Sequence, residues 1–520
     1  MKRRILVGSI AVVAVLSAVA AGVILPQLGG AEVATSSVSV IPRPAQLKLL
    51  PGEPFTLPAA PTISADPALA PVGDYLAESI SASTHDIVNL ADGGSDAAIA
   101  LEFDPALAEE AYTLRATEDG IRISAGAPAG AFWAVQTLRQ LLSPAAPWTV
   151  PAVDIEDSPR FAYRAAMLDV ARHFFPVDDV KRYIDDIALL KINHLHLHLT
   201  DDQGWRLEIK SRPLLTEVGS RSQVGTGEGG YYTQDDYREL VAYAASRYVT
   251  IVPEIDVPGH TNAALASYAE LNPDGNAAAP YTGIEVGFSS LDANSEVTYD
   301  FLEDVLREVA ELTPGPYLHI GGDESRATSD EDFETFVARA SRIAADNGKT
   351  VIGWHEMGQS TELPRGTIGQ YWNYTEPETP QTVEHALSFV EQGGKLIMSP
   401  ADVAYLDMKY DAATIQGLTW AQGFTDVAEA YSWDPADVLP GVGDEQLLGV
   451  EAPLWSETIE TIDEIEFMAF PRLAAIAELA WSPRDQHDLD EFLGRLPAFG
   501  AYLDALDIRY NRAPGVDWRG

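Results

Sequence analysis

The stretch HLHLHLTDDQGWR, residues 194–206, holds one predicted strand together with the loop that follows it. Histidine and leucine alternate from His194 to Leu199, and a period of two is typical of a β-strand. The apolar run stops at Thr200, and two aspartates and a tryptophan come soon after it. A strand that ends in acidic and aromatic residues is typical of a barrel whose site lies on the loops after the strands.

The same pattern recurs through most of the chain, and several of the apolar runs are followed by helical periodicity. One predicted helix carries Val180, Ile184, Ile187 and Leu190 on one face, and another extends through 333–343 and stops near Gly348. The eight predicted strands are 165–170, 194–200, 249–255, 317–321, 350–354, 368–372, 395–399 and 447–451. This alternation predicts an α/β fold, a (β/α)8 TIM barrel over residues 160–512.

A smaller α+β domain is predicted before the barrel, over residues 43–155. Residues 112–125 alternate on both sides of Asp119-Gly120, which indicates a β-hairpin. A helical face follows, with Phe132, Val135 and Leu138 on one side. The Pro-rich segment 143–159 is interpreted as the domain boundary.

The first 30 residues are typical of an export signal. Lys2, Arg3 and Arg4 precede an apolar run from 5 to 25, and Ala18-Val19-Ala20 offers a small-x-small cleavage site. The run is also long enough to span a bilayer, so an uncleaved membrane anchor is the alternative. Residues 31–42 are interpreted as a linker. Either way, we expect the folded part to be secreted or otherwise extracytoplasmic.

Composition narrows the function classes. The 78 acidic and 34 basic residues give a formal charge of −44, which argues against a nucleic-acid partner because phosphate binding needs basic patches. The chain has no cysteine, so disulfides, thiolate metal sites and thiol nucleophiles are excluded.

Carboxylates and tryptophans recur just after the predicted strands, where a barrel places its site. They are Arg172 with Asp169, Asp201 with Asp202, Asp256 with His260, Asp323 with Glu324, then Trp354, Trp372, Tyr405 with Asp407, and Trp455 with Glu457. Indole rings stack on the apolar faces of sugars, while carboxylates and arginine bind the hydroxyls. The set therefore indicates a carbohydrate site.

The His194, His196 and His198 run also has a metal interpretation, because alternate residues share one face of a strand. These histidines lie along the predicted strand and not at its end. We therefore expect His196 to pack inside the barrel, and we predict no metal site and no cofactor.

Several long motifs, in this order, resemble the bacterial family-20 β-N-acetylhexosaminidases. They are LDVARHFF (168–175), LHLHLTDDQGWR (195–206), VPEIDVPGHTNAALASY (252–268), YLHIGGDES (317–325), QYWN (370–373), AYLDMKY (404–410) and EAPLWSET (451–458). The resemblance extends from about residue 40 to 510. It implies a small α+β domain followed by a catalytic (β/α)8 barrel, in agreement with the periodicity.

The resemblance implies a retaining exo-glycosidase that removes terminal, non-reducing β-linked N-acetylglucosamine or N-acetylgalactosamine from oligosaccharides. The nucleophile in that family is the substrate's own 2-acetamido oxygen, and the intermediate is an oxazolinium ion. Open alternatives are an enzyme that releases a disaccharide, as lacto-N-biosidases do, a non-catalytic sugar-binding protein, and a zinc hydrolase using the histidine run. No protein partner is implied.

By the same resemblance, Glu324 is the general acid and later the base, Asp323 holds the acetamide N–H, and Tyr405 donates to the acetamide oxygen. Asp201 and His260 are expected to tune Glu324. The remaining expected sugar-pocket residues are three tryptophans as walls and three hydroxyl readers: Trp354, Trp372, Trp455, Arg172, Asp407 and Glu457.

The order Gly321-Gly322-Asp323-Glu324 raises a geometric question, because neighbours on a strand point to opposite faces. On that basis we expect Asp323 and Glu324 to point apart and to serve different parts of one sugar. The two glycines are expected to bend the strand end and to let the backbone approach the sugar.

Overall fold

The computed structural model describes residues 38–91 and 97–518. The predicted export signal or anchor, and the predicted linker as far as residue 37, lie outside these ranges. No helix within them is both long and apolar enough to cross a membrane.

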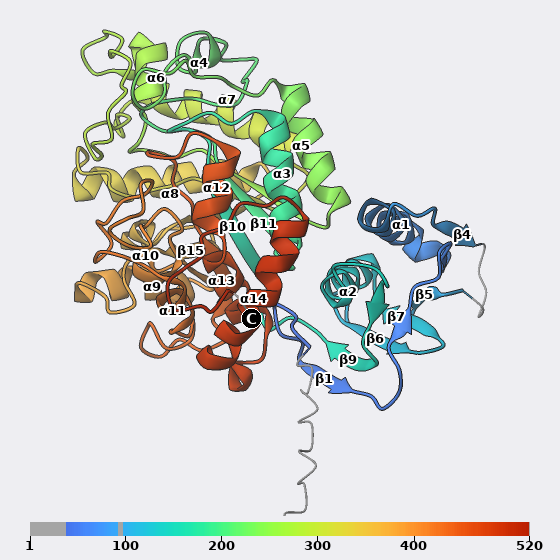
Figure 1. Cartoon of the computed structure of the whole chain (residues 1–520). Coiled ribbons are helices and arrows are strands. Elements are labelled where there is room, and N and C mark those ends of the chain that lie inside the picture. Colours follow the sequence, from blue (N-terminus) through green and yellow to red (C-terminus); the bar gives the residue numbers. More distant parts are fainter. Residues whose placement is uncertain (1–37, 92–96, 519–520) are drawn as a thin grey trace, which may run out of the picture. The chain divides into compact units, whose positions relative to one another are not determined.

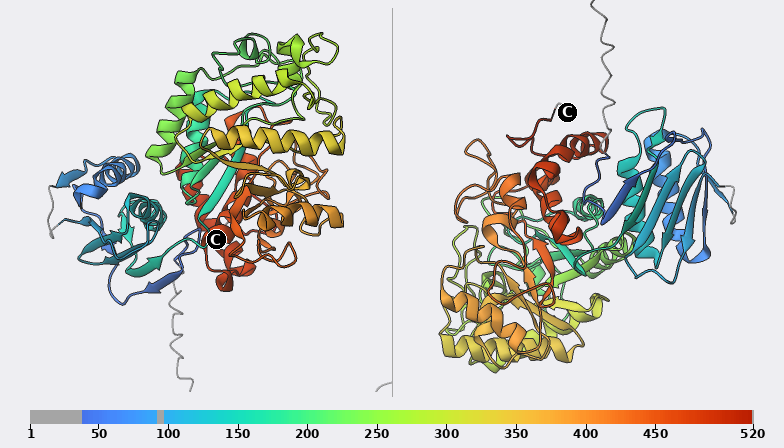
Figure 2. Two further views of the ribbon diagram at one scale, coloured as in Figure 1. Left: turned by 180° about the vertical axis from the view of Figure 1, so that it is seen from behind. Right: turned by 90° about the horizontal axis from the view of Figure 1, so that it is seen from below.

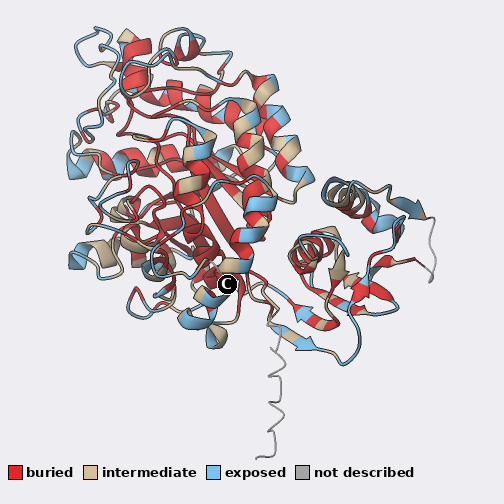
Figure 3. Cartoon of the chain, in the orientation of Figure 1, coloured by how far each residue is buried: buried red, intermediate tan, exposed pale blue. Residues whose placement is uncertain are grey.

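Eight parallel strands close into a barrel in chain order, which confirms the predicted fold (Figure 1). The strands are β10(Tyr163–Asp169), β11(His194–His198), β12(Thr250–Glu254), β13(Tyr317–His319), β14(Thr350–Trp354), β15(Ile368–Tyr371), β16(Leu396–Met398) and β17(Leu447–Ala452). β10 pairs with both β11 and β17, which completes the ring. Every residue of β10 is buried, as expected for a strand covered by helices on its outer face (Figure 3).

Helices surround this ring and bury one face each. In α3(Val177–Ala188), Val180, Ile184 and Ile187 are buried, as the spacing predicts, whereas Leu190 lies beyond the helix end. The other helices of this part are α4(Leu214–Glu217), α5(Gln234–Ser246), α6(Asn262–Ser267), α7(Glu296–Leu312), α8(Asp330–Asp346), α9(Pro380–Glu391), α10(Ala401–Ala404), α11(Val427–Tyr431), α12(Ile462–Ala469), α13(Arg472–Trp481) and α14(Leu489–Ala505), with the 3-10 helices η2(Ala269–Leu271), η3(His355–Gln359) and η4(Arg484–Gln486). Between β14 and β15 the connection is only η3.

The N-terminal part is a mixed sheet with two helices (Figure 2). Its strands run in the order β1-β9-β6-β7-β5-β3-β4, and β6 and β7 form the predicted hairpin. The elements are β1(Gln46–Leu49), β3(Thr62–Ala65), β4(Asn89–Ala91), β5(Ile99–Phe103), β6(Tyr112–Thr117), β7(Gly120–Ala125), β9(Val153–Asp157), α1(Ala70–Thr84), α2(Pro128–Leu141), the 3-10 helix η1(Pro67–Leu69) and a separate pair, β2(Phe55–Thr56) with β8(Thr149–Val150).

Two sequence boundaries need correction. Val40 and Ile41, placed in the predicted linker, are each 1% exposed, and the Gln140 amide bonds both backbone groups of Ile41. The Pro-rich segment taken as a boundary contains β9, which lies between β1 and β6 in the sheet. Proline and small residues suggest a linker and a domain boundary in these two segments, but the apolar side chains between them pack in the core.

The N-terminal part joins the barrel through a buried ionic cluster, here called the junction cluster: Asp157, Lys191, Tyr112 and Trp481. Lys191 Nζ lies 2.8 Å from Asp157 Oδ2, and both side chains are fully buried. Tyr112 OH donates to the same oxygen at 2.6 Å, and Trp481 Nε1 lies 3.0 Å from each Asp157 oxygen. The carboxylate is therefore saturated with donors from both parts of the chain.

Candidate active site

A cavity of about 400 Å³ opens at the carboxyl ends of the barrel strands. Most of the predicted site residues line it, as the strand-end rule predicts: Arg172, His260, Asp323, Glu324, Trp372, Tyr405, Trp455 and Glu457. The side chains that follow different strands in the sequence are thus brought together around one cavity.

Three predicted residues lie behind this lining. Asp201 is buried and contacts Arg172 and His260. Trp354 is 1% exposed, and its Nε1 donates to Glu254 Oε1 at 3.0 Å. Its indole lies 6.0 Å from the Trp455 ring, so it supports a wall of the cavity from behind. Asp407 is 2% exposed.

The acidic loop after β13 does not follow strand geometry. The strand ends at His319, and Gly321, Gly322 and Glu324 all have positive φ, of 67°, 100° and 46°. A Cβ at Gly321 would lie 1.7 Å from Asp256 Oδ1, so only glycine fits there. Positive φ is uncommon for a glutamate, and such backbone strain concentrates at functional sites.

The expectation that Asp323 and Glu324 point apart is therefore wrong. His260 Nε2 lies 3.5 Å from Asp323 Oδ2 and 3.7 Å from Glu324 Oε2, so both carboxyl groups approach one imidazole. The glycines turn the chain after the strand has ended, which removes the alternation on which the expectation depended.

Glu324 has the environment of an acid. Burial, with the neighbouring charge of Asp323, raises the pKa of Glu324. Arg326 Nη2 donates to Glu324 Oε1 at 2.6 Å, but this arginine is largely exposed and only partly offsets the effect. A carboxyl group that keeps its proton at higher pH is suited to general acid catalysis.

Two buried carboxylate oxygens near the cavity accept no hydrogen bond from a described residue. They are Asp323 Oδ1 and Asp407 Oδ2. A buried acceptor without a donor costs free energy, so such atoms are rare unless a ligand uses them. Both oxygens are therefore available to N–H or O–H groups of a bound molecule.

An ionic chain connects Arg172 with the acidic loop. Arg172 Nη2 lies 2.7 Å from Asp201 Oδ2, and His260 Nδ1 lies 3.3 Å from Asp201 Oδ1. Although burial opposes it, the charges of Asp201 and Asp323 raise the pKa of His260 well above its ordinary value. The imidazole thus presents a protonated nitrogen to Asp323 and Glu324.

Aromatic rings form much of the remaining wall. Tyr405 lies 6.2 Å from the Trp455 ring, and the Arg172 guanidinium lies 4.7 Å from that indole. Trp420 was missed by the sequence analysis: it is 44% exposed and lines the cavity, 5.7 Å from Tyr405 and 6.1 Å from Trp372. The only indication in the sequence that Trp420 belongs to the site is its residue type and its place in the long loop after the seventh predicted strand.

Glu356 is a second residue that the sequence analysis missed. Trp372 Nε1 donates to both of its oxygens, at 3.1 and 2.9 Å, so this carboxyl fixes an indole of the cavity. Loss of hydration and the charge of Asp323 raise the pKa of Glu356 to about 8. Glu356 follows Trp354 by two residues, so its position just after the fifth predicted strand could have identified it as a site residue.

A ring nitrogen of His260 and one carboxylate oxygen each of Asp323 and Glu324 lie within 4.8 Å of one another, which is close enough to hold a metal ion. The same spacing suits groups that share protons. The other imidazole nitrogen faces Asp201, which orients the ring toward the two acids. Together with the raised pKa of Glu324, this arrangement fits proton transfer directly.

Comparison with known proteins agrees with this geometry. The sequence model described as glycosyl hydrolase family 20, catalytic domain, matches residues 161–484, and that of domain 2 of the family matches residues 37–158. The chain belongs to glycosyl hydrolase family 20. The assignment makes the protein a glycoside hydrolase of the β-N-acetylhexosaminidase type, as the motifs predict, and favours this over the disaccharide-releasing and sugar-binding alternatives.

Individual relatives are similar over nearly their whole length. A β-N-acetylhexosaminidase of Cellulomonas fimi is 42% identical over 491 residues, covering 93% of this chain and 98% of that protein. The solved family-20 β-N-acetylhexosaminidase of Streptomyces coelicolor A3(2) is 48% identical, with a TM-score of 0.89, covering 92% and 98% of the two chains. The Streptomyces plicatus N-acetyl-β-hexosaminidase, solved in complex with Thio-NAglucal, is 47% identical with the same TM-score, covering 92% and 97%.

Proposed function

We propose that the protein is a retaining exo-enzyme that removes terminal β-linked N-acetylglucosamine or N-acetylgalactosamine, with the substrate's acetamido oxygen as nucleophile. The observation that carries the proposal is the pairing of Glu324, whose pKa is raised, with the buried, unpartnered Asp323 Oδ1 beside it. One carboxyl group can donate a proton while its neighbour receives an N–H group.

Glu324 acts first as the acid. It donates its proton to the glycosidic oxygen as the bond to the anomeric carbon breaks, and it later takes a proton from the attacking water. His260 and Asp323 face it, so its proton affinity depends on their charges.

Asp323 and Tyr405 hold the acetamide for attack. Asp323 Oδ1 accepts the acetamide N–H and stabilises the positive charge that grows on the oxazolinium ring. Burial and the charge of Asp407 raise the pKa of Tyr405 well above its ordinary value, so its hydroxyl stays protonated and donates to the acetamide oxygen. The oxygen is thereby aimed at the anomeric carbon.

The hydroxyls of the terminal sugar are bound by Arg172, Glu457 and Asp407. Arg172 and Glu457 line the cavity, and Asp407 Oδ2 is a free acceptor beside it. Trp455 supplies an apolar face for the ring. In support, a mutant of the Streptomyces plicatus enzyme was solved in complex with product, GlcNAc.

Acetamide participation can be tested with matched aryl glycosides that carry N-acetyl or N-trifluoroacetyl groups. Fluorine withdraws electrons from the amide oxygen and weakens it as a nucleophile, so kcat/KM should fall steeply for the fluorinated substrate. Equal rates for the two substrates would contradict the proposal. An aryl disaccharide run in parallel should be hydrolysed far more slowly than the aryl N-acetylglucosaminide, because the proposed enzyme removes single sugars.

We also propose that the enzyme is exported through residues 1–30 and acts outside the cytoplasm on chitin fragments. The basic start and apolar run of this segment support export. The mass of the mature protein from the source cells tests this: loss of about the first 20 to 30 residues is expected for a cleaved signal. Full-length protein in the soluble cytoplasmic fraction would contradict export, and full-length protein in the membrane fraction would indicate an anchor.

A further inference from the structure

The histidine run on β11 is not used by the proposed mechanism, yet His198 at its end contacts Asp201 and Arg172 of the site. His194, His196 and His198 point to the same side of the strand, at successive depths in the barrel. His194 is partly exposed, with Nδ1 2.6 Å from the Asn193 side-chain oxygen. His196 and His198 are fully buried, and each lies between two carboxylates.

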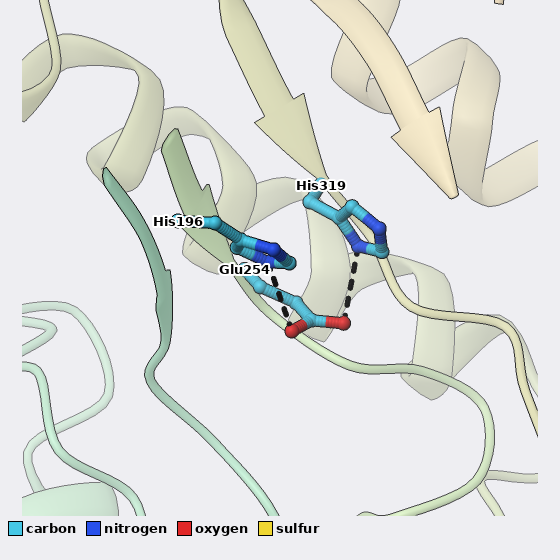
Figure 4. A group of neighbouring side chains, drawn as sticks. All are labelled: His196, Glu254 and His319. Atoms are coloured by element: carbon cyan, nitrogen blue, oxygen red, sulfur yellow. Dashed lines mark ion pairs between the residues drawn. The ribbon is translucent and has the colours of Figure 1, made fainter. Parts of the chain in front are cut away.

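Glu254, on the neighbouring strand β12, connects these histidines. Figure 4 shows its carboxylate between His196 and His319, with ion-pair distances of 3.1 Å on each side. His198 Nδ1 lies 2.5 Å from Glu254 Oε2, and Trp354 donates to Oε1. The negative charge of Glu254 is balanced by protons on His196 and His198, because the neighbouring carboxylates raise both pKa values although burial opposes this. Burial lowers the pKa of His319, whose Nδ1 accepts the backbone N–H of Gly321.

The partners of His198 fix its protonation. Nδ1 faces Glu254, and Nε2 lies 2.9 Å from Asp201 Oδ2. Carboxylates only accept hydrogen bonds, whereas a neutral imidazole can donate from one nitrogen only. Although burial opposes it, the charge of Glu254 raises the pKa of His198 to about 9. The ring therefore carries both protons.

We propose that His198, held as an imidazolium between Glu254 and Asp201, is a positioning residue of this site that fixes the orientation and charge of the Asp201–His260 pair facing Glu324. The inference rests on the proposed role of Glu324 as the acid. It extends the ionic chain of the site from the cavity down into the barrel core.

The arrangement explains how two cations lie side by side. Arg172 Nη1 is only 3.4 Å from His198 Nε2, and Asp201 Oδ2 contacts both. Asp201 thus has a cation on the cavity side and another on the core side of Oδ2, while its Oδ1 faces His260 and accepts the backbone N–H of Asp202. Without His198, only the arginine would hold that oxygen, and the carboxylate could rotate toward the cavity.

His198 is enclosed from several elements. The titratable and charged groups that face it are Glu254 of β12, Asp256 of the loop after β12, Asp201 of the loop after β11 and Arg172 of the loop after β10. The Trp455 ring, from the loop after β17, lies edge-on at 4.9 Å. Loss of the imidazolium charge would therefore act mainly on these neighbours. Through Asp201 and His260 it would also change the pKa of Glu324.

The test is the pH profile of kcat/KM for His198→Gln on an aryl N-acetylglucosaminide. Glutamine keeps a donor but loses the charge, so the cluster becomes more negative and Glu324 becomes harder to ionise. The alkaline limb should move to higher pH by about 0.5 to 1 unit, with a fall in kcat. The matched control is His194→Gln on the same strand, and the alkaline limb of its kcat/KM profile should stay where it is in the wild type.

A fall in kcat with an unmoved limb, or an equal shift in His194→Gln, would overturn the proposal. Glu324→Gln, measured alongside, keeps the two hypotheses separate: an alkaline limb that persists there refutes Glu324 as the acid, whatever His198 does. Neutron diffraction from the wild-type chain near neutral pH needs no variant to fold. Deuterium on both nitrogens of His198 is expected, and deuterium on one alone would overturn the inference.

Discussion

The active site and the junction cluster are both buried ionic groups, but they differ in how completely their carboxylates are bonded. Asp157 at the junction receives Lys191, Tyr112 and Trp481. At the active site, Asp323 Oδ1 accepts nothing from a described residue. The saturated carboxylate joins two parts of the chain, whereas the unsaturated one is left available to a substrate.

The difference also appears in the backbone. The acidic loop of the active site has positive φ at Glu324, and glycines precede it. At the junction, Asp157 is the last residue of the regular strand β9. Strain and unused acceptors cost stability, so their presence together indicates selection for chemistry.

Glu324→Gln should have the largest effect. The amide cannot donate an acidic proton, so kcat/KM for an oligosaccharide should fall by about 10² to 10⁴-fold, with thermal stability nearly unchanged. Steady-state kinetics and a melting curve measure both. Glu331→Gln, at the exposed start of α8, is the matched control and should retain wild-type activity. A wild-type rate in Glu324→Gln would refute its role.

Lys191→Met should lower stability and leave the activity of the folded protein unchanged, which is the opposite of the effect of Glu324→Gln. It leaves Asp157 buried and short of its cation, which should cost about 3 to 5 kcal/mol of the free energy of unfolding, with kcat preserved in the folded protein. Denaturant titration gives the loss. The control is Arg115→Met, which removes an exposed pair with Asp154 and should cost about 1 kcal/mol or less. Equal losses would contradict the expected cost of leaving Asp157 buried without its cation.

Tyr405→Phe should lower kcat by about 10²-fold with a smaller change in KM, because the hydroxyl is needed most as the acetamide oxygen attacks. The ring contacts with Trp455 and Trp420 are kept, so the fold should be unaffected. If KM rises and kcat stays the same, the hydroxyl serves ground-state binding instead.

Glu356→Gln should have the smallest effect, visible mainly in the pH dependence of stability. The folded pKa of Glu356 is about 8 against an ordinary value of 4.5, so between these values the folded state binds more protons than the unfolded state. Its contribution to stability is therefore complete below 4.5 and is lost as pH rises through about 8. The melting temperature of the variant should fall less steeply over this range than that of wild type. Glu376→Gln, exposed on a nearby loop, should follow wild type.

The barrel was predictable because its strands appear in the sequence as short apolar runs or, in β11, as a regular alternation of leucine with histidine. β14 was predicted to the residue, and the other strands were found within a few residues of their ends. The cavity followed from the strand-end rule, which needs only the order of elements. Such features depend on local pattern and topology, which the sequence states directly.

The errors have a different origin. The direction of Asp323 and Glu324 depends on the φ angles of the preceding glycines, which no periodicity reveals. Trp420 reaches the cavity from a long loop without regular structure. Trp354 packs in one cluster with Tyr405 and Trp455 behind the cavity lining, and its indole N–H donates to Glu254. These outcomes depend on packing between distant segments.

The most direct test of the account compares Asp323→Asn with Glu324→Gln on two aryl N-acetylglucosaminides, one with a phenyl and one with a dinitrophenyl leaving group. A dinitrophenolate departs without a proton, so the loss of kcat/KM in Glu324→Gln should shrink by about tenfold or more on that substrate. The loss in Asp323→Asn should be equal on both substrates, because this residue holds the acetamide and not the leaving oxygen. If Asp323→Asn recovered with the dinitrophenyl substrate and Glu324→Gln did not, the roles assigned to the two neighbouring acids would be contradicted.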